Sequence, residues 1–478
     1  MREVYVISDL HIGGEPAGSN ELRGFQINTH THQLANFINL LARKSDKSVE
    51  LVINGDLVDF LAETPWTAFE KHLPNVLIKL NNIFRREAHV FNALKTFLQN
   101  SKHRLTLLLG NHDIELSLPP VRAILEKTIG ATSANFRFLF DGEAYSIGNE
   151  VLIEHGNRYD SWNSVDDNRL RQFREKMSRN EKADSFIAPK GSELVEKIMN
   201  PMKVKYPFVD MLKPETGAAI PILLALEPQI RSKIDNLLRI YLSDMIPEGL
   251  GIRTISTGSK GSESVEENLV NKEMEKLFSD AELQEFLTAT DALPNPAEEA
   301  EISSVDGTTE KTRSFRLVHS LWQLLTANNR QALYKRLPAL LTALKSLQSP
   351  KTFDLDTETF PEYLQAATQL SENGFKYIIF GHTHLARRIN LPNGGVYINS
   401  GTWADLMKFP TNILDHPDKH YALEQLERFI EEITGKDLIK HIIFKPTCVY
   451  IALDEQEHVT DIHLQTYDEQ AMQLRWLA

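Results

Sequence analysis

Residues 377–386 read YIIFGHTHLA, an apolar run that ends in a glycine and then in two histidines separated by one residue. A short run of β-branched and aromatic residues that ends at glycine is typical of a buried strand. Two imidazoles, His382 and His384, therefore follow directly after a strand, and such a placement needs a chemical reason. The same pattern recurs earlier in the chain and supplies one.

Four other apolar runs also end in polar clusters. After VYVIS, ELVIN, RLTLLL and VLIE, the polar residues are Asp9 and His11, then Asp56 and Asp59, then Asn111, His112 and Asp113, then His155. In an open α/β sheet the loops at one strand edge gather into one crevice, where ligands bind. We therefore expect these side chains to converge. Oxygen and imidazole ligands without thiolates suit Mn, Fe or Zn.

The five blocks, D-x-H, G-D-x-x-D, G-N-H-D, H-G and G-H-x-H in this order, resemble the calcineurin-like metallophosphoesterases. Any one block could be a helix cap or a turn, whereas five in order need five coincidences. The resemblance runs from Asp9 to His384 and finds no motif in residues 162–370. It implies an α/β (α+β) fold, a two-layered β-sandwich flanked by helices, with a two-metal site and a large helical insertion.

The resemblance also implies a role for each site residue. One metal would be bound by Asp9, His11 and His384, the other by Asn111, His155 and His382, with Asp56 bridging both. Asn111 is also expected to contact the substrate. The expected cofactors are two divalent ions, with Mn²⁺ as the first choice and Fe or Zn as alternatives. One loop carrying His382 and His384 can then serve both metals, which explains their spacing.

His112 is expected to act in catalysis and not as a ligand. In the resembled family this histidine protonates the leaving group or stabilises charge on it, and Asp59 would hold its ring and favour its charged form. Arg158 follows His155 by three residues and could bind a substrate phosphate. A surface salt bridge explains Arg158 equally well.

Two departures count against the serine/threonine protein phosphatases of the resembled family. Phe60 stands where those enzymes carry an arginine, and G-N-H-D replaces their G-N-H-E. The stretch IEHGNRYDSWN, followed by a helical insertion, is similar to the UDP-2,3-diacylglucosamine pyrophosphohydrolases. That family has aspartate where this chain has Asn157, and its cap is much smaller.

The chain alternates strands and helices up to about residue 161, with one long helical stretch expected at 68–99 and meandering strands at 137–154. The pattern predicts a catalytic domain in two parts, residues 1–161 and 371–478. Residues 162–370 form the predicted helical insertion, with a flexible linker at about 290–313. Within it, residues 205–230 are apolar and are read first as core, with a lipid-binding or partner-binding pocket as the alternative.

Composition limits the function classes. The 478 residues carry a net charge of −13, which disfavours a nucleic-acid partner. Cys448 is the one cysteine, and neither a signal peptide nor a membrane span is evident, so we expect a cytoplasmic protein. His30 and His32 also form an H-x-H, but they lead into a helical pattern that splays the two rings, so a structural role is favoured.

These observations predict a dinuclear metal-dependent hydrolase of a phosphoric ester or anhydride, acting as a phosphatase, phosphodiesterase or pyrophosphatase on a small phosphorylated or pyrophosphate substrate. One alternative is a nuclease resembling the double-strand-break repair exonucleases. Another is a regulatory or scaffolding protein that retains a vestigial metal site and acts through a protein partner of its insertion.

Overall fold

The computed structural model describes residues 2–18, 24–182, 186–213, 215–227, 320–321, 323–324 and 333–477. Two compact units are present: residues 1–226 with 348–478, and residues 227–347. All predicted site residues lie in the first unit. The predicted linker at 290–313 lies outside the described residues, as does the part of the predicted helical insertion at 228–319. The predicted insertion boundaries at 162 and 370 stay a prediction.

A seven-stranded sheet joins the two ends of the chain. Its order is β15-β14-β13-β1-β2-β3-β4, in which β1 to β4 are parallel and β13 pairs antiparallel with β1. The strands are β1 (Arg2–Ile7), β2 (Ser48–Asn54), β3 (Arg104–Leu108), β4 (Phe136–Leu139), β13 (Thr447–Leu453), β14 (Val459–Asp468) and β15 (Gln473–Trp476).

A five-stranded sheet has the order β5-β6-β8-β10-β9, with β6, β8 and β10 parallel. Its strands are β5 (Tyr145–Ile147), β6 (Val151–Ile153), β8 (Tyr377–Phe380), β9 (Arg387–Asn390) and β10 (Val396–Asn399). A small third sheet holds β7 (Leu212–Lys213), β11 (Leu406–Lys408) and β12 (Ile442–Ile443). The predicted meander was wrong, because β4 belongs to one large sheet and the β5–β6 pair to the other.

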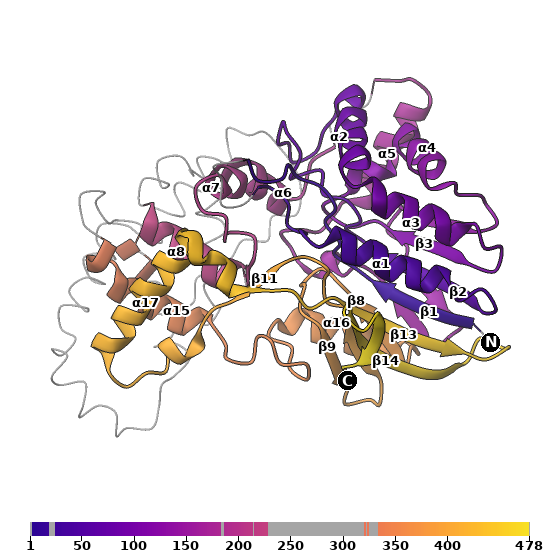
Figure 1. Cartoon of the computed structure of the whole chain (residues 1–478). Helices are drawn as coiled ribbons and strands as arrows, with labels where there is room; N and C mark the ends of the chain where they lie inside the picture. The colour runs from indigo at the N-terminus through magenta and orange to yellow at the C-terminus, as the bar shows by residue number, and fades with distance from the viewer. Residues whose placement is uncertain are drawn as a thin grey trace. The chain divides into compact units, whose positions relative to one another are not determined.

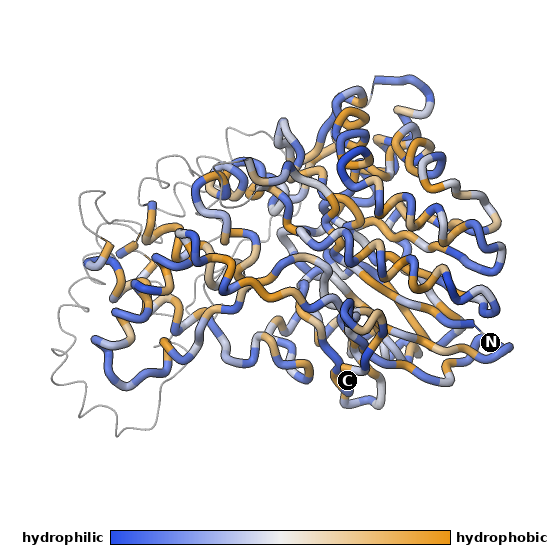
Figure 2. The backbone as a smooth tube through the Cα atoms, in the orientation of Figure 1, coloured by the Kyte–Doolittle hydropathy of each residue, from blue (hydrophilic) through white to orange (hydrophobic). Residues whose placement is uncertain are grey.

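Alternating side chains show that the two large sheets pack face to face. In β1, Val4 and Val6 enter a core shared with Ile379 of β8 and Ile398 of β10. Tyr5 and Ile7 point the other way, into the core that the N-terminal helices cover. In β8, Ile378 and Phe380 face outward against α16 (Pro361–Glu372). This confirms the sandwich flanked by helices. Figure 2 shows hydrophobic stretches along its central strands.

Helices α1 to α4 cover the outer face of the seven-stranded sheet (Figure 1). Among the described residues, the α-helices of the first unit other than α16 are α1 (Thr31–Ala42), α2 (Leu73–Arg86), α3 (Ala88–Leu98), α4 (Pro119–Ile129), α5 (Asp167–Ser178), α6 (Lys190–Leu194), α7 (Asn200–Lys203), α8 (Glu215–Leu226) and α17 (Lys419–Thr434). The second unit contributes α15 (Leu337–Leu347).

The long helix predicted at 68–99 is two helices, and the break falls at Glu87. The Glu87 backbone leaves helical geometry at φ −106° and ψ 30°. Its carboxylate accepts hydrogen bonds from Thr31 Oγ1 at 2.7 Å and from Gln26 Nε2 at 2.9 Å. These tertiary contacts hold Glu87 in the interior, and sequence periodicity does not reveal them. Across the described ranges, no helix combines the length and the apolar character that crossing a bilayer requires.

Candidate metal centre

The predicted ligands lie just past the ends of strands from both large sheets. Asp9 and His11 follow β1, Asp56 follows β2 and Asn111 follows β3 in the seven-stranded sheet. His155 follows β6, and both His382 and His384 follow β8 in the five-stranded sheet. The site therefore draws on both layers of the sandwich.

Five of these residues have left-handed backbones, with φ of 53° for Asp9, 43° for His11, 53° for Asp56, 66° for His382 and 63° for His384. For a residue other than glycine this conformation costs on the order of 1–3 kcal/mol and persists only where the surroundings enforce it. Here the amides of Leu10 and His11 both donate to the Asp56 carbonyl at 2.9 Å, which locks two of the loops together. Such strain is concentrated at functional sites.

Asp9, His11 and His384 form the first converging group. The Nδ1 of His11 lies 3.3 Å from Asp59 Oδ2, and a carboxylate only accepts, so this nitrogen carries the hydrogen and Nε2 keeps a lone pair. That Nε2 is 3.0 Å from His384 Nε2, which is 3.4 Å from Asp9 Oδ1. Two ligand atoms that are each bound at about 2.0–2.2 Å to the same metal lie at roughly these distances from one another.

His155, Asp56 and Asn111 form the second converging group. His155 Nδ1 lies 2.8 Å from the Asn54 carbonyl and must donate to it, which leaves the Nε2 lone pair free. Nε2 in turn lies 3.3 Å from both Asp56 Oδ2 and Asn111 Oδ1. Three atoms that present lone pairs to one point repel one another unless a cation or a proton lies between them. This donor set fits a divalent metal ion.

Asp56 lies between the two groups. Its Oδ2 is also 3.7 Å from His11 Nε2, and its Oδ1 accepts the His112 amide at 2.9 Å. Gly110 makes this approach possible, because a Cβ there would collide with the Asp56 carboxylate. Gly55 likewise has a φ of 83°, and a Cβ on it would strike the His155 ring. A carboxylate in this position can bridge two cations, as the resemblance implies.

The electrostatics favour positive charge beside Asp9 and Asp56, although burial and the charge of Lys213 lower the pKa of the His384 ring itself to about 3. Burial opposes ionisation of Asp9, but contact with His384 overcomes it and lowers the Asp9 pKa to about 2. Burial lowers the His155 pKa, yet the Asp56 carboxylate outweighs it and raises that pKa to about 10. A bound divalent cation would satisfy the same demand and displace the proton.

His11, Asp59 and His112 form a third group of suitable composition. Asp59 Oδ2 lies 3.3 Å from His11 Nδ1 and 3.2 Å from His112 Nδ1. A carboxylate that accepts from His11 Nδ1 and lies within ion-pair distance of the His112 ring needs no cation to explain the geometry. Burial would raise the Asp59 pKa, but the charges of His112 and His11 hold it far below its ordinary value. Asp59 is thus an anion that orients the His112 ring.

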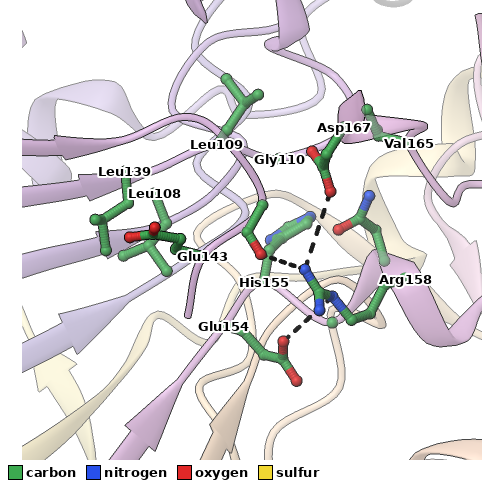
Figure 3. Close-up of a pocket in the computed structure, with 13 residues that line it drawn as sticks. Leu108, Leu109, Gly110, Leu139, Glu143, Glu154, His155, Arg158, Val165 and Asp167 are labelled. Carbon is green, nitrogen blue, oxygen red and sulfur yellow. Dashed lines mark hydrogen bonds and ion pairs between the residues drawn. The ribbon is translucent and has the colours of Figure 1, made fainter. Parts of the chain in front are cut away.

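Arg158 is engaged by other protein groups. Its guanidinium lies 3.3 Å from Glu154 Oε2 and 4.0 Å from Asp167 Oδ2, and it also donates to the Gly142 carbonyl. These residues border a cavity of about 40 Å³ that His155 also lines (Figure 3). The structure shows the salt bridge of the alternative interpretation, and phosphate binding by Arg158 stays a prediction.

His382 is placed differently from the other predicted ligands. Its amide donates to both Asp9 oxygens, at 3.1 and 3.0 Å, so its loop is tied to the first group. Its ring nitrogen Nε2, however, lies 3.1 Å from Asp160 Oδ2 and belongs to neither converging group. The sequence interpretation gave no role to Asp160, although it lies in the HGNRYD stretch five residues after His155.

The two histidines near α1 are used structurally. His30 Nε2 lies 2.9 Å from the buried Asp405 carboxylate, and its ring stacks on Phe444 at a centroid distance of 3.7 Å. The His32 ring stacks on His89 at 3.9 Å. These contacts agree with the structural role favoured for His30 and His32.

Residues 3–211 match the model of the calcineurin-like phosphoesterase family. The matched part contains the four blocks from Asp9 to His155, whereas His382 and His384, in the loop after β8, lie beyond it. No curated protein and no solved structure matches the chain. The calcineurin-like phosphoesterase match indicates a metal-dependent phosphoester hydrolase, and the Asp/His clusters are able to hold metal.

Proposed function

We propose that the protein is a dinuclear metal-dependent hydrolase of a phosphoric ester or anhydride bond. The observation that supports this most directly is the position of Asp56, whose Oδ2 lies between the lone pairs of His155 Nε2 at 3.3 Å and His11 Nε2 at 3.7 Å. A carboxylate between two sets of imidazole and oxygen ligands suits two cations. The match of residues 3–211 to the calcineurin-like phosphoesterases supports the same reaction class.

Two divalent ions, when bound, supply the Lewis acidity that polarises a phosphoryl group and activates water for in-line attack. The chain supplies the rest. Asp9, His11 and His384 would hold one ion, and Asn111, His155 and His382 the other. His112 would protonate the leaving oxygen, because Asp59 orients its ring and stabilises its charged form.

The finer substrate assignment is also a proposal. A pyrophosphate or phosphodiester substrate is supported by the HGNRYD stretch and by the long segment between His155 and His382, both similar to the UDP-2,3-diacylglucosamine pyrophosphohydrolases. Asn157 departs from that pattern and donates to the Asn163 carbonyl at 3.0 Å. The charge of −13 weighs against a polyanionic nucleic acid.

A substrate panel tests the proposal. Chelated protein reconstituted with Mn²⁺ should hydrolyse at least one of a phosphomonoester, a phosphodiester and a pyrophosphate diester, and Asp56→Ala should abolish the reaction. Protein that binds Mn²⁺ and hydrolyses nothing in the panel would favour the regulatory or scaffolding alternative.

A further inference from the structure

We propose that Asp160 and Asn163 are positioning residues of the second metal site, because together they orient two of its predicted ligands, Asn111 and His382. Neither residue belongs to the ligand set. The inference rests on the proposed function, since it concerns how that site holds its metal. It assigns a role to the loop that directly follows His155.

Asp160 decides which nitrogen His382 presents. Its Oδ2 lies 3.1 Å from His382 Nε2, and an ionised carboxylate can only accept, so Nε2 carries the hydrogen. A neutral imidazole has one N–H, and therefore Nδ1 keeps the lone pair that a metal needs. A carboxylate that holds a ligating histidine in this way also fixes its ring orientation and raises its basicity.

Asn163 extends this contact to Asn111. Its Nδ2 donates to Asp160 Oδ2 at 2.7 Å, and its Oδ1 accepts from Asn111 Nδ2 at 3.5 Å. The Asn111 amide nitrogen is thereby turned toward Asn163, and its Oδ1 faces His155 Nε2. Three hydrogen bonds thus connect a residue after β3 with a residue after β8, across the two large sheets.

The loop itself is held rigidly. Asp160 Oδ1 accepts the Trp162 amide at 2.8 Å, and the amides of Asn163 and Ser164 donate to the Asp160 carbonyl at 3.1 and 2.9 Å. The Gly191 amide at the start of α6 donates to the Trp162 carbonyl at 2.8 Å. The carboxylate is therefore fixed by its own loop before any metal binds, as an orienting group should be.

Outer partners of this kind change metal affinity about 10- to 100-fold. Asp160→Ala should therefore weaken binding at one of the two sites by this factor and leave the other unchanged. Asp160→Asn keeps an oxygen that accepts from Nε2–H and should lose less. Asp166→Ala is the matched control, because Asp166 lies in the same segment and its carboxylate contacts Arg169 at the start of α5, through the Arg169 amide and the Arg169 Nε at 3.3 Å, and no predicted ligand.

The experiment is a calorimetric Mn²⁺ titration of the chelated full-length chain and these variants. Long-range ¹H–¹⁵N spectra of histidine-labelled, metal-free protein should show His382, assigned with His382→Gln, as the Nε2–H tautomer in wild type and as a tautomer mixture in Asp160→Ala. Unchanged affinity at both sites in Asp160→Ala, or an equal loss at both with a lower melting temperature, would overturn the inference. Wild-type protein that binds no Mn²⁺ would instead refute the proposed function.

Discussion

A single backbone carbonyl, that of Asn54, determines which ring nitrogen of His155 faces the site. It accepts the Nδ1–H hydrogen bond at 2.8 Å, so the Nε2 lone pair points toward Asp56 and Asn111. Asp59 does the same for His11 from the other side. For His155 and His11, the Nδ1 hydrogen is thus bound by a group outside the ligand set, and the Nε2 lone pair faces the site.

The predicted role of His112 as the general acid can be tested by substitution. His112→Ala should keep both metal sites, because Asp59 and not a cation accounts for the position of its ring. The rate on a substrate with a poor leaving group should fall on the order of 10²–10⁴-fold, the usual contribution of general acid catalysis, and should fall less with p-nitrophenolate as leaving group. Steady-state kinetics together with elemental analysis would measure both effects.

His420→Ala is the control for that experiment, because the His420 side chain is 84% exposed and pairs only with the nearby Glu424 in the described structure. It should change neither rate nor metal content. Loss of metal from His112→Ala would make His112 a ligand, and an unchanged rate on the poor leaving group would exclude it as the acid.

At the scale of elements, the strands could be predicted and the links between them could not. VYVIS, ELVIN, RLTLLL and YIIF became β1, β2, β3 and β8 because their apolar runs are buried on both faces. The break between α2 and α3 was missed because Glu87 is held by side chains distant in sequence. The role of Asp160 was missed for the same reason, since its partner His382 is more than 200 residues away.

Glu115 lies in the short helix η1 (Ile114–Ser117), which follows the GNHD block, and its buried carboxyl makes the free energy of unfolding depend on pH. Burial raises the pKa of Glu115 from its ordinary 4.5 to about 7. The folded state therefore keeps a proton that the unfolded chain has released, so stability falls as pH rises through this window. Glu115→Gln has no proton to lose. Its free energy of unfolding relative to wild type should rise by about 3 kcal/mol between pH 4.5 and pH 8.

Denaturant unfolding at several pH values would measure this difference. The exposed Glu424→Gln variant should follow wild type at every pH, which controls for the general effect of removing a carboxylate. In the wild-type protein the Glu70 amide donates to Glu115 Oε1 at 2.9 Å, and the side-chain oxygen of the Glu115→Gln variant can accept the same hydrogen bond. If the Glu115→Gln and wild-type curves run parallel, Glu115 does not titrate as described.

At the scale of the whole molecule, every predicted site residue lies in the unit formed by 1–226 and 348–478. Buried Arg387 of β9 holds the residues that directly follow the second unit, because its guanidinium donates to the carbonyls of Asp354 and Thr352. The sequence predicted a large insertion between His155 and His382. It could not show that residues up to 226 and from 348 onward belong to the unit that holds the site.

Replacing residues 227–347 with a Gly/Ser linker tests the role of the second unit. The shortened chain should still bind two Mn²⁺ ions, because all predicted ligands remain. Its preference among the panel substrates should change if the removed residues act as a substrate cap, the role predicted for the helical insertion. Equal kcat/KM values on every substrate before and after the replacement would mean that the second unit does not determine specificity.

Hydrolysis measured against added equivalents of Mn²⁺, starting from chelated protein and using the best substrate of the panel, tests the two-metal site most directly. We expect no turnover without metal, a plateau at two equivalents per chain, and no turnover at any metal concentration for Asp56→Ala, because Asp56 lies between both groups. Turnover by the chelated wild-type protein at the plateau rate, or by Asp56→Ala at the wild-type rate, would contradict a two-metal hydrolase.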